Sequence, residues 1–162
     1  MSWRFPFRRA GLRTDFTMTA IISVYDDAFY LDRCFRNMSD CGVEAIVIDN
    51  DCLPTTRDIV NCYKGDVVRE VVRHPRAGTF DWSAILRHKE EIANRIDSDW
   101  IFLWDSDEIR EAPVGNRSFR EAIRATDEAG YTTVNFDEFV FLPTTKDEDY
   151  TEGNYVEALR TY

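Results

Sequence analysis

The sequence lacks any hydrophobic run long enough to span a membrane, and its first residues lack the apolar centre of a secretory signal peptide. Its cysteines, Cys34, Cys41, Cys52 and Cys62, show neither a paired metal-binding spacing nor a redox motif. We therefore expect a cytoplasmic protein with free thiols. The spacing of Cys34 and Cys41 places them on one face of a predicted helix, where packing is their expected role.

Positive charge is also scarce, because 20 lysines and arginines stand against 30 aspartates and glutamates, for a net charge of -10. This balance disfavours nucleic acid as a partner, and a bound divalent cation would offset part of it. The exception is a basic arm over residues 1–17, in which arginines alternate with aromatic residues. For this arm we expect at most a peripheral contact with an anionic membrane surface, at the inner face. The alternative is a poorly ordered leader.

Repeats, linkers and low-complexity segments are absent too, and 162 residues fit one domain. The chain instead alternates β-type apolar runs with segments of helical spacing. We predict strands at residues 18–24, 43–48, 67–72 and 100–104, and helices at 28–41, 55–63, 81–96 and 118–129. Residues 131–142 are predicted to form one long strand or a bent pair of strands. This order predicts an α/β fold with a mostly parallel central sheet and helices on both faces, as one domain over residues 18–162.

Single residues indicate how these helices begin and which side they bury. Asp26 or Asp27 is expected to cap the first helix with its side chain, and Asp81 is expected to cap the third. The third helix carries Trp82 on its apolar side, which we expect to pack on the sheet. Its other side carries Lys89 among charged residues, and we interpret that side as solvated.

The most informative stretch is the apolar run Trp100–Trp104, which leads directly into Asp105, Ser106, Asp107 and Glu108. Such a run is typical of a buried strand in a parallel sheet, and ligands of α/β sheets bind at the carboxyl ends of the strands. In an extended chain, Asp105 and Asp107 would face the same point, because side chains alternate with a period of two. Two carboxylates held close together favour Mg²⁺ or Mn²⁺. The alternative is a solvated acidic turn.

Three separated features resemble one enzyme family: the run Ala20–Tyr25, Asp49 after the second strand, and Asp105-Ser106-Asp107 after the fourth. Over residues 18–142 they are similar to the nucleotide-binding half of a family 2 glycosyltransferase of the GT-A, Rossmann-like fold. The resemblance implies an inverting hexosyltransferase that moves a sugar from a nucleotide-diphosphate donor to an unknown glycan, lipid or protein acceptor. It also implies Mn²⁺ or Mg²⁺ as the cofactor.

The resemblance implies roles for five residues. Val24 and Tyr25 match a turn that packs against the base of the donor. Asp49 matches an acid that hydrogen-bonds the base or the ribose. Asp105 matches the first acid of the Asp-x-Asp motif, which contacts the ribose or the metal, and Asp107 matches the second, which holds the metal on the diphosphate.

The chain also departs from the family pattern. Residues 50–54 replace the usual acid-Gly-Ser turn, so the base specificity is open. No residue matches the general base convincingly, since Asp137 and Glu138 read as strand-edge acids. We therefore expect the base beyond Tyr162, with the domain truncated at its C-terminal end. His74 and Arg76 follow the third strand, and either a phosphate contact or a plain loop role fits them.

Two other classes of function stay open. One is a non-catalytic fragment that binds nucleotide sugars. The other is a different metal-dependent enzyme acting on nucleotides or phosphates. A haloacid-type phosphatase would place its acids after the first strand, not the fourth. A nucleotidyltransferase would place a glycine-rich basic loop after the first strand, where this chain has the acidic Tyr25-Asp26-Asp27.

Overall fold

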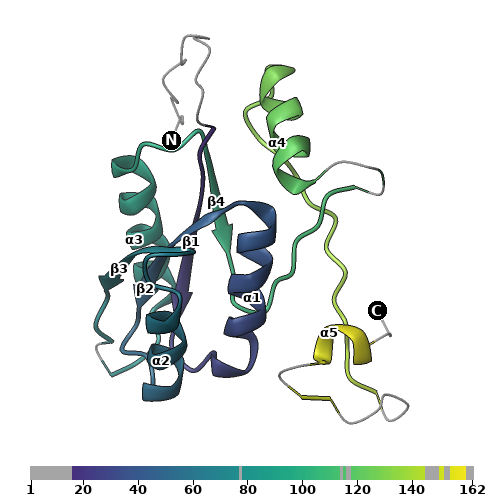
Figure 1. Cartoon of the computed structure of the whole chain (residues 1–162). Helices are drawn as coiled ribbons and strands as arrows, with labels where there is room; N and C mark the ends of the chain where they lie inside the picture. The colour runs from purple at the N-terminus through teal and green to yellow at the C-terminus, as the bar shows by residue number, and fades with distance from the viewer. Residues whose placement is uncertain are drawn as a thin grey trace.

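A computed structural model describes residues 16–76, 78–113, 115, 118–144, 150–151 and 154–159. Most of the expected basic arm lies outside these residues. The elements in chain order are β1 (Met18–Val24), α1 (Ala28–Cys41), β2 (Glu44–Asp49), α2 (Pro54–Cys62), β3 (Val68–Arg73), α3 (Trp82–Arg95), β4 (Trp100–Trp104), α4 (Phe119–Glu128) and α5 (Tyr155–Ala158), as Figure 1 shows.

The strands form one 4-stranded sheet in the order β3-β2-β1-β4, and every pairing is parallel. This confirms the predicted α/β class with a parallel sheet. In the β1–β4 pairing, Ile22 lies opposite Trp104, so β4 ends two residues before the end of β1. The predicted bounds of β1 and β4 agree with the structure because both strands are continuous apolar runs.

Helices cover both faces of the sheet (Figure 1). On one face, α1, α2 and α4 bury side chains such as Phe35, Val60 and Ile123 in the same cluster as Ile22 of β1. On the other face, α3 contributes Ile85 and Ile92 to a second cluster with apolar side chains of β1 and β2. Side chains alternate between the two clusters along each strand, as the strand period requires.

Helix ends agree with expectation at some positions and differ at others. Gly42 ends α1 in the left-handed conformation, with φ 68, which suits a residue without Cβ. Asp81 caps α3, and its Oδ1 accepts a hydrogen bond from the amide of Ala84 at 2.9 Å. The expected side-chain cap of α1 was wrong. Asp27 occupies the cap position but makes no capping hydrogen bond, because its carboxylate binds other groups described below.

Three further expectations need correction. Trp82 is 49% exposed instead of packed on the sheet, and Lys89, expected in solvent, is 2% exposed. Residues 131–142 form no strand but an irregular segment. Within it, Val134 and Phe136 pack on the core, whereas Tyr131, Phe139, Val140, Phe141 and Leu142 are exposed. The apolar run that predicted a strand has no neighbouring strand to pair with among the described residues.

Candidate functional site

The sheet changes direction between β1 and β4. From β1 the chain proceeds outward through β2 to β3, and then returns to place β4 on the opposite side of β1. The loops that follow β1 and β4 therefore leave the sheet next to each other at its carboxyl edge. In open α/β sheets, this switch point is where ligands bind. The acidic stretch Asp105–Glu108 lies there, directly after β4.

Asp105–Glu108 forms a tight turn. The amide of Glu108 donates a hydrogen bond to the carbonyl oxygen of Asp105 at 3.2 Å, as in a β-turn. The expectation that Asp105 and Asp107 face one point rested on an extended chain, and the turn contradicts that geometry. Asp105 points toward α3, whereas the Asp107 carboxylate acts electrostatically on the Cys34 thiol of α1.

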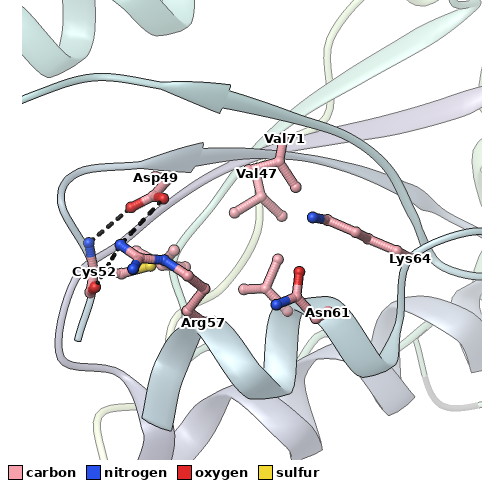
Figure 2. Close-up of a pocket in the computed structure, with 9 residues that line it drawn as sticks. Val47, Asp49, Cys52, Arg57, Asn61, Lys64 and Val71 are labelled. Atoms are coloured by element: carbon pink, nitrogen blue, oxygen red, sulfur yellow. Dashed lines mark hydrogen bonds and ion pairs between the residues drawn. The ribbon is translucent and has the colours of Figure 1, made fainter. Parts of the chain in front are cut away.

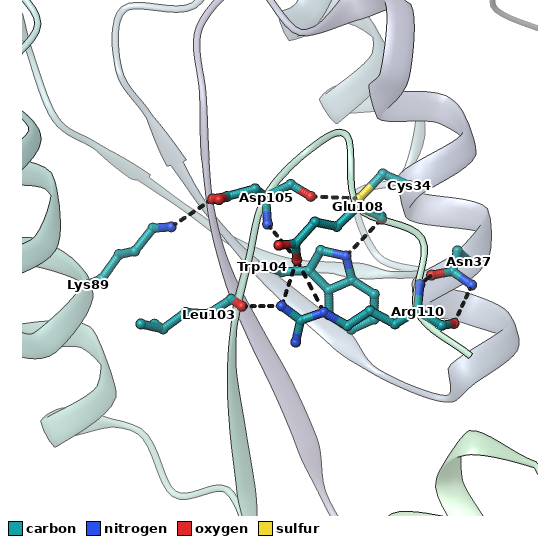
Figure 3. Close-up of polar contacts among 8 residues, drawn as sticks. All are labelled: Cys34, Asn37, Lys89, Leu103, Trp104, Asp105, Glu108 and Arg110. Carbon is teal, nitrogen blue, oxygen red and sulfur yellow. Dashed lines mark hydrogen bonds and ion pairs between the residues drawn. The ribbon is translucent and has the colours of Figure 1, made fainter. Parts of the chain in front are cut away.

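Asp105 is held by a buried lysine. The Lys89 Nζ of α3 lies 3.3 Å from Asp105 Oδ1, and the lysine side chain is 3% exposed against 57% for the aspartate (Figure 3). The same ammonium lies 5.8 Å from the centre of the Trp82 ring, so an exposed indole covers the pair on one side. A buried ammonium needs a counter-charge, and Asp105 supplies it. The sequence did not indicate Lys89 as a site residue, because the charged side of the third helix was expected to face solvent.

Arg110 fixes the far side of the turn. Its guanidinium donates to Glu108 Oε2 at 2.6 Å and to the carbonyl of Leu103 at 2.6 Å (Figure 3). Its backbone exchanges hydrogen bonds with the Asn37 side chain of α1, at 2.8 and 3.0 Å. The indole of Trp104 also donates to the carbonyl of Glu108 at 3.1 Å. The turn is thus tied to α1 and β4, which gives Glu108 a structural role.

The loops after β1 and β4 are joined by one side-chain contact. Ser106 donates a hydrogen bond to Asp27 Oδ1 at 2.5 Å, and the other oxygen of Asp27 accepts from the amide of Tyr25 at 2.5 Å. These contacts explain why Asp27 does not cap α1. They also set the position of Asp107, which follows Ser106 directly and is exposed.

Asp49 lies at the same edge of the sheet but on the opposite face from Asp105. It continues the alternation of Ala45 and Val47 toward α1 and α2. Asp49 and Val24 line a pocket of about 70 Å³ between the sheet and α2 (Figure 2). Sites for small organic ligands are roughly 300–1,000 Å³. The structure therefore brings Val24 and Asp49 together, in a space too small for a nucleoside.

The contacts of Asp49 lie within its own loop and α2. Its Oδ1 accepts from the amide of Cys52 at 2.7 Å, and its Oδ2 lies 3.6 Å from an Arg57 nitrogen (Figure 2). Val24 is 1% exposed, so its side chain belongs to the core. Both carboxylate oxygens of Asp49 therefore already have partners within the protein. The role that the resemblance implies for both residues stays a prediction.

Tyr25, another residue of the predicted donor site, is 38% exposed. The Arg76 guanidinium lies 3.9 Å from the centre of its ring, in a cation–π contact. The Arg76 amide donates to Asp51 Oδ2 at 2.8 Å, and this bond is the largest cause of the lowered pKa of Asp51. Arg76 and His74 line a second pocket, of about 180 Å³, at the carboxyl edge of the sheet.

His74 also contacts α3. Its Nδ1 lies 3.0 Å from the Nδ1 of His88. Burial, with a further contribution from His74, lowers the pKa of His88. One of the two rings must be neutral for this hydrogen bond to form, because two protonated rings have only donors. The pair joins the loop after β3 to α3.

The thiols beside the site are poor nucleophiles. Burial raises the pKa of Cys34 to about 12 and that of Cys41 to about 11. Cys34 Sγ lies 3.7 Å from the carbonyl oxygen of Asp105, and Cys41 Sγ lies 3.5 Å from that of Arg110. Both cysteines are buried, which confirms the expectation that they pack against the core.

Carboxylate oxygens, such as those of Asp107, are suitable ligands for a hard divalent cation. Most of the other ligands of such a cation would come from a bound phosphate group and from water. Within the described part of the chain, no three His, Cys, Asp or Glu residues come close enough together to enclose a metal ion. Mg²⁺ in enzymes is commonly held by one or two carboxylates, with phosphate oxygens and waters completing the shell. Asp107 fits that mode because it is exposed on a fixed turn, whereas Asp105 already has Lys89 as its counter-charge.

Comparisons with known proteins found no protein-family model that matches the chain and no curated protein that matches it. Among the described residues, no helix has the length and apolar character needed to cross a membrane.

Proposed function

We propose that this chain is the donor-binding part of a metal-dependent glycosyltransferase of the GT-A type. The observation that carries the proposal is the position of the acidic turn. Asp105–Glu108 lies at the switch point between β1 and β4, and Ser106 ties it to the loop after β1. Nucleotides bind at such a point in α/β sheets because the loops on either side leave a crevice there.

The proposed roles follow from exposure and contacts. Asp107 would bind the cation on the donor's diphosphate, since Lys89 forms its ion pair with Asp105 instead. A divalent cation bound there would stabilise the negative charge that develops on the departing diphosphate. Asp105, fixed by Lys89, would accept a hydrogen bond from the ribose. Tyr25 would offer its exposed ring to the base, and Arg76 would contact the base or a phosphate.

The acceptor and the general base stay undefined. Asp137 and Glu138 lie on the irregular segment after α4 and are exposed, with no feature that marks either as a base.

Calorimetric titration of the chain with uridine and guanosine diphosphate, in Mn²⁺ and in chelator, tests the proposal. We expect dissociation constants from micromolar to millimolar in Mn²⁺, and weaker binding in chelator. Asp107→Asn should lower affinity about tenfold in Mn²⁺ because it removes an anionic ligand. In chelator it should leave affinity unchanged or raise it, because repulsion between the carboxylate and the diphosphate is relieved.

The matched control is Asp66→Asn. Asp66 is an exposed acid just before β3, at the amino ends of the strands and away from the acidic turn. It should bind as the wild type does. Asp107→Asn should change the free energy of unfolding by less than about 0.5 kcal/mol, as expected of an exposed residue. Equal binding in Mn²⁺ and chelator would remove the metal role. An equal loss for Asp107→Asn in both conditions would make the aspartate structural.

A further inference from the structure

Three exposed aromatic side chains border the switch point on the side of α3. Tyr25 lies in the loop after β1, Phe80 in the loop after β3, and Trp82 at the start of α3. They are 38%, 55% and 49% exposed, respectively. The Phe80 and Trp82 rings lie 6.0 Å apart, measured between centroids. Scattered apolar side chains are normal on a surface, but a gathered group marks a binding surface, and we call these three the aromatic row.

Direct contacts join the aromatic row to the proposed donor site at both ends. The Arg76 guanidinium lies 3.9 Å from the centre of the Tyr25 ring and 5.7 Å from that of the Phe80 ring. At the other end, the ammonium that pairs with Asp105 at 3.3 Å lies 5.8 Å from the centre of the Trp82 ring. The aromatic row is therefore continuous with the acidic turn, so a ligand on its rings lies beside a ligand held by that turn.

A pocket with polar walls adjoins the aromatic row. It has a volume of about 180 Å³, and its walls include a guanidinium, an imidazole, an amide, a hydroxyl and a carboxylate, from Arg76, His74, Asn50, Thr79 and Asp81. Arg76 belongs to both features, because it also contacts two rings of the row. Asp81 lies between Phe80 and Trp82 in the sequence. Aromatic rings and hydrogen-bonding groups are thus available to one ligand.

This combination suits a saccharide better than a protein or a membrane. A sugar ring has C–H groups on its faces, which are attracted to the negative face of an aromatic ring, and hydroxyls around its edge, which need hydrogen-bonding groups. Three aromatic side chains are too few for a protein interface, which takes roughly 20–30 residues on each side. A chain with a net charge of -10 is repelled by an anionic membrane surface.

We propose that the aromatic row and the adjoining pocket bind a saccharide, which is the acceptor of the proposed transferase. The pocket is smaller than the roughly 300–1,000 Å³ of sites that enclose a whole small ligand. It therefore takes the hydroxyl edge of a sugar whose face rests on the exposed ring of Trp82. The inference rests on the proposed function for the role of this sugar, and it narrows the acceptor from a glycan, lipid or protein to a glycan.

Nuclear magnetic resonance titration with four neutral disaccharides, cellobiose, maltose, lactose and chitobiose, tests this inference. We expect the indole N–H signal of Trp82 to shift for at least one of them, with a dissociation constant on the order of millimolar, as for a small ligand held by few contacts. The indole signals of the buried Trp100 and Trp104 should not shift. Trp82→Leu keeps an apolar side chain but removes the ring, so it should weaken binding about tenfold, as followed by backbone amide signals.

Further variants separate stacking from a structural role. Trp82→Tyr keeps a ring and should retain most of the affinity. Tyr131→Leu removes an exposed ring after α4, outside the aromatic row, and should bind as the wild type does. Melting temperatures are measured for every variant without sugar, and Phe80→Leu replaces Trp82→Leu if the latter is unstable. If Trp82→Tyr is as stable as the wild type but does not bind, stacking does not hold the sugar and the inference is wrong.

The remaining outcomes separate this inference from the proposed function. If uridine diphosphate binds in Mn²⁺ but no disaccharide shifts the Trp82 signal, the inference is wrong and the proposed function stands. If a disaccharide binds but uridine diphosphate does not, the saccharide site stands and the transferase assignment fails. If only vesicles of phosphatidylcholine and phosphatidylglycerol shift the Trp82 signal, the aromatic row contacts a membrane and the inference is wrong. If the wild type binds neither disaccharides nor uridine diphosphate, both proposals are overturned.

Discussion

Asp105 and Asp107, two acidic residues of the turn after β4, differ in how much their removal should destabilise the folded protein. Asp105 is the counter-charge of Lys89, whose side chain is 3% exposed, whereas Asp107 is exposed to solvent. Removing Asp105 leaves an ammonium buried without its partner. Removing Asp107 leaves no buried group unpaired. The structure adds that only Asp105 of the two is paired with a buried lysine.

Asp105→Ala should therefore lower the free energy of unfolding by about 1–3 kcal/mol, with Asp107→Ala as the control that changes it by less than about 0.5 kcal/mol. Adding Lys89→Met to Asp105→Ala should recover most of the loss, because the buried charge disappears with its partner. Urea denaturation of the four proteins measures these differences. Equal stability of Asp105→Ala and the wild type would mean that Lys89 finds another partner.

At the scale of elements, the two histidines connect the loop after β3 to α3. Because the pKa of His88 is lowered in the folded protein, the unfolded chain binds more protons as the pH falls through the ordinary histidine pKa of about 6.5. Stability should be full above that value and should fall below it. His88→Gln should show a flatter dependence. Urea denaturation between pH 8 and pH 5 tests this, and an equally flat wild-type curve would contradict it.

The elements themselves were largely predictable. The bounds of β1 and β4 follow from continuous apolar runs, and Asp81 marks the start of α3 by its capping side chain. The strand over residues 131–142 was wrong because an apolar run has strand character only beside a partner strand. Lys89 was misplaced because residue type alone does not tell whether a lysine near the carboxyl edge meets a carboxylate.

At the scale of the whole molecule, the order of the parallel strands determines which loops lie at the same edge of the sheet. The sequence order of strands and helices predicted that the loops after β1, β2 and β4 meet at one sheet edge, and the structure agrees. It did not predict which face each acid takes. Asp49 follows the alternation toward α2, and Asp105 follows it toward α3, so these two acids lie on opposite faces of the sheet. The packing of the Tyr155 ring on the Phe29 and Tyr30 rings of α1 was not predictable either, because it joins residues far apart in the sequence.

The central claim is that a divalent cation and a diphosphate bind at the switch point between β1 and β4. Paramagnetic broadening of backbone amide signals by Mn²⁺, in the presence of uridine diphosphate, tests it most directly. Mg²⁺ serves as the diamagnetic control. The account predicts the strongest broadening at residues 25–27 and 105–108, with α4 little affected. Broadening centred elsewhere, or unchanged in Asp107→Asn, would contradict it.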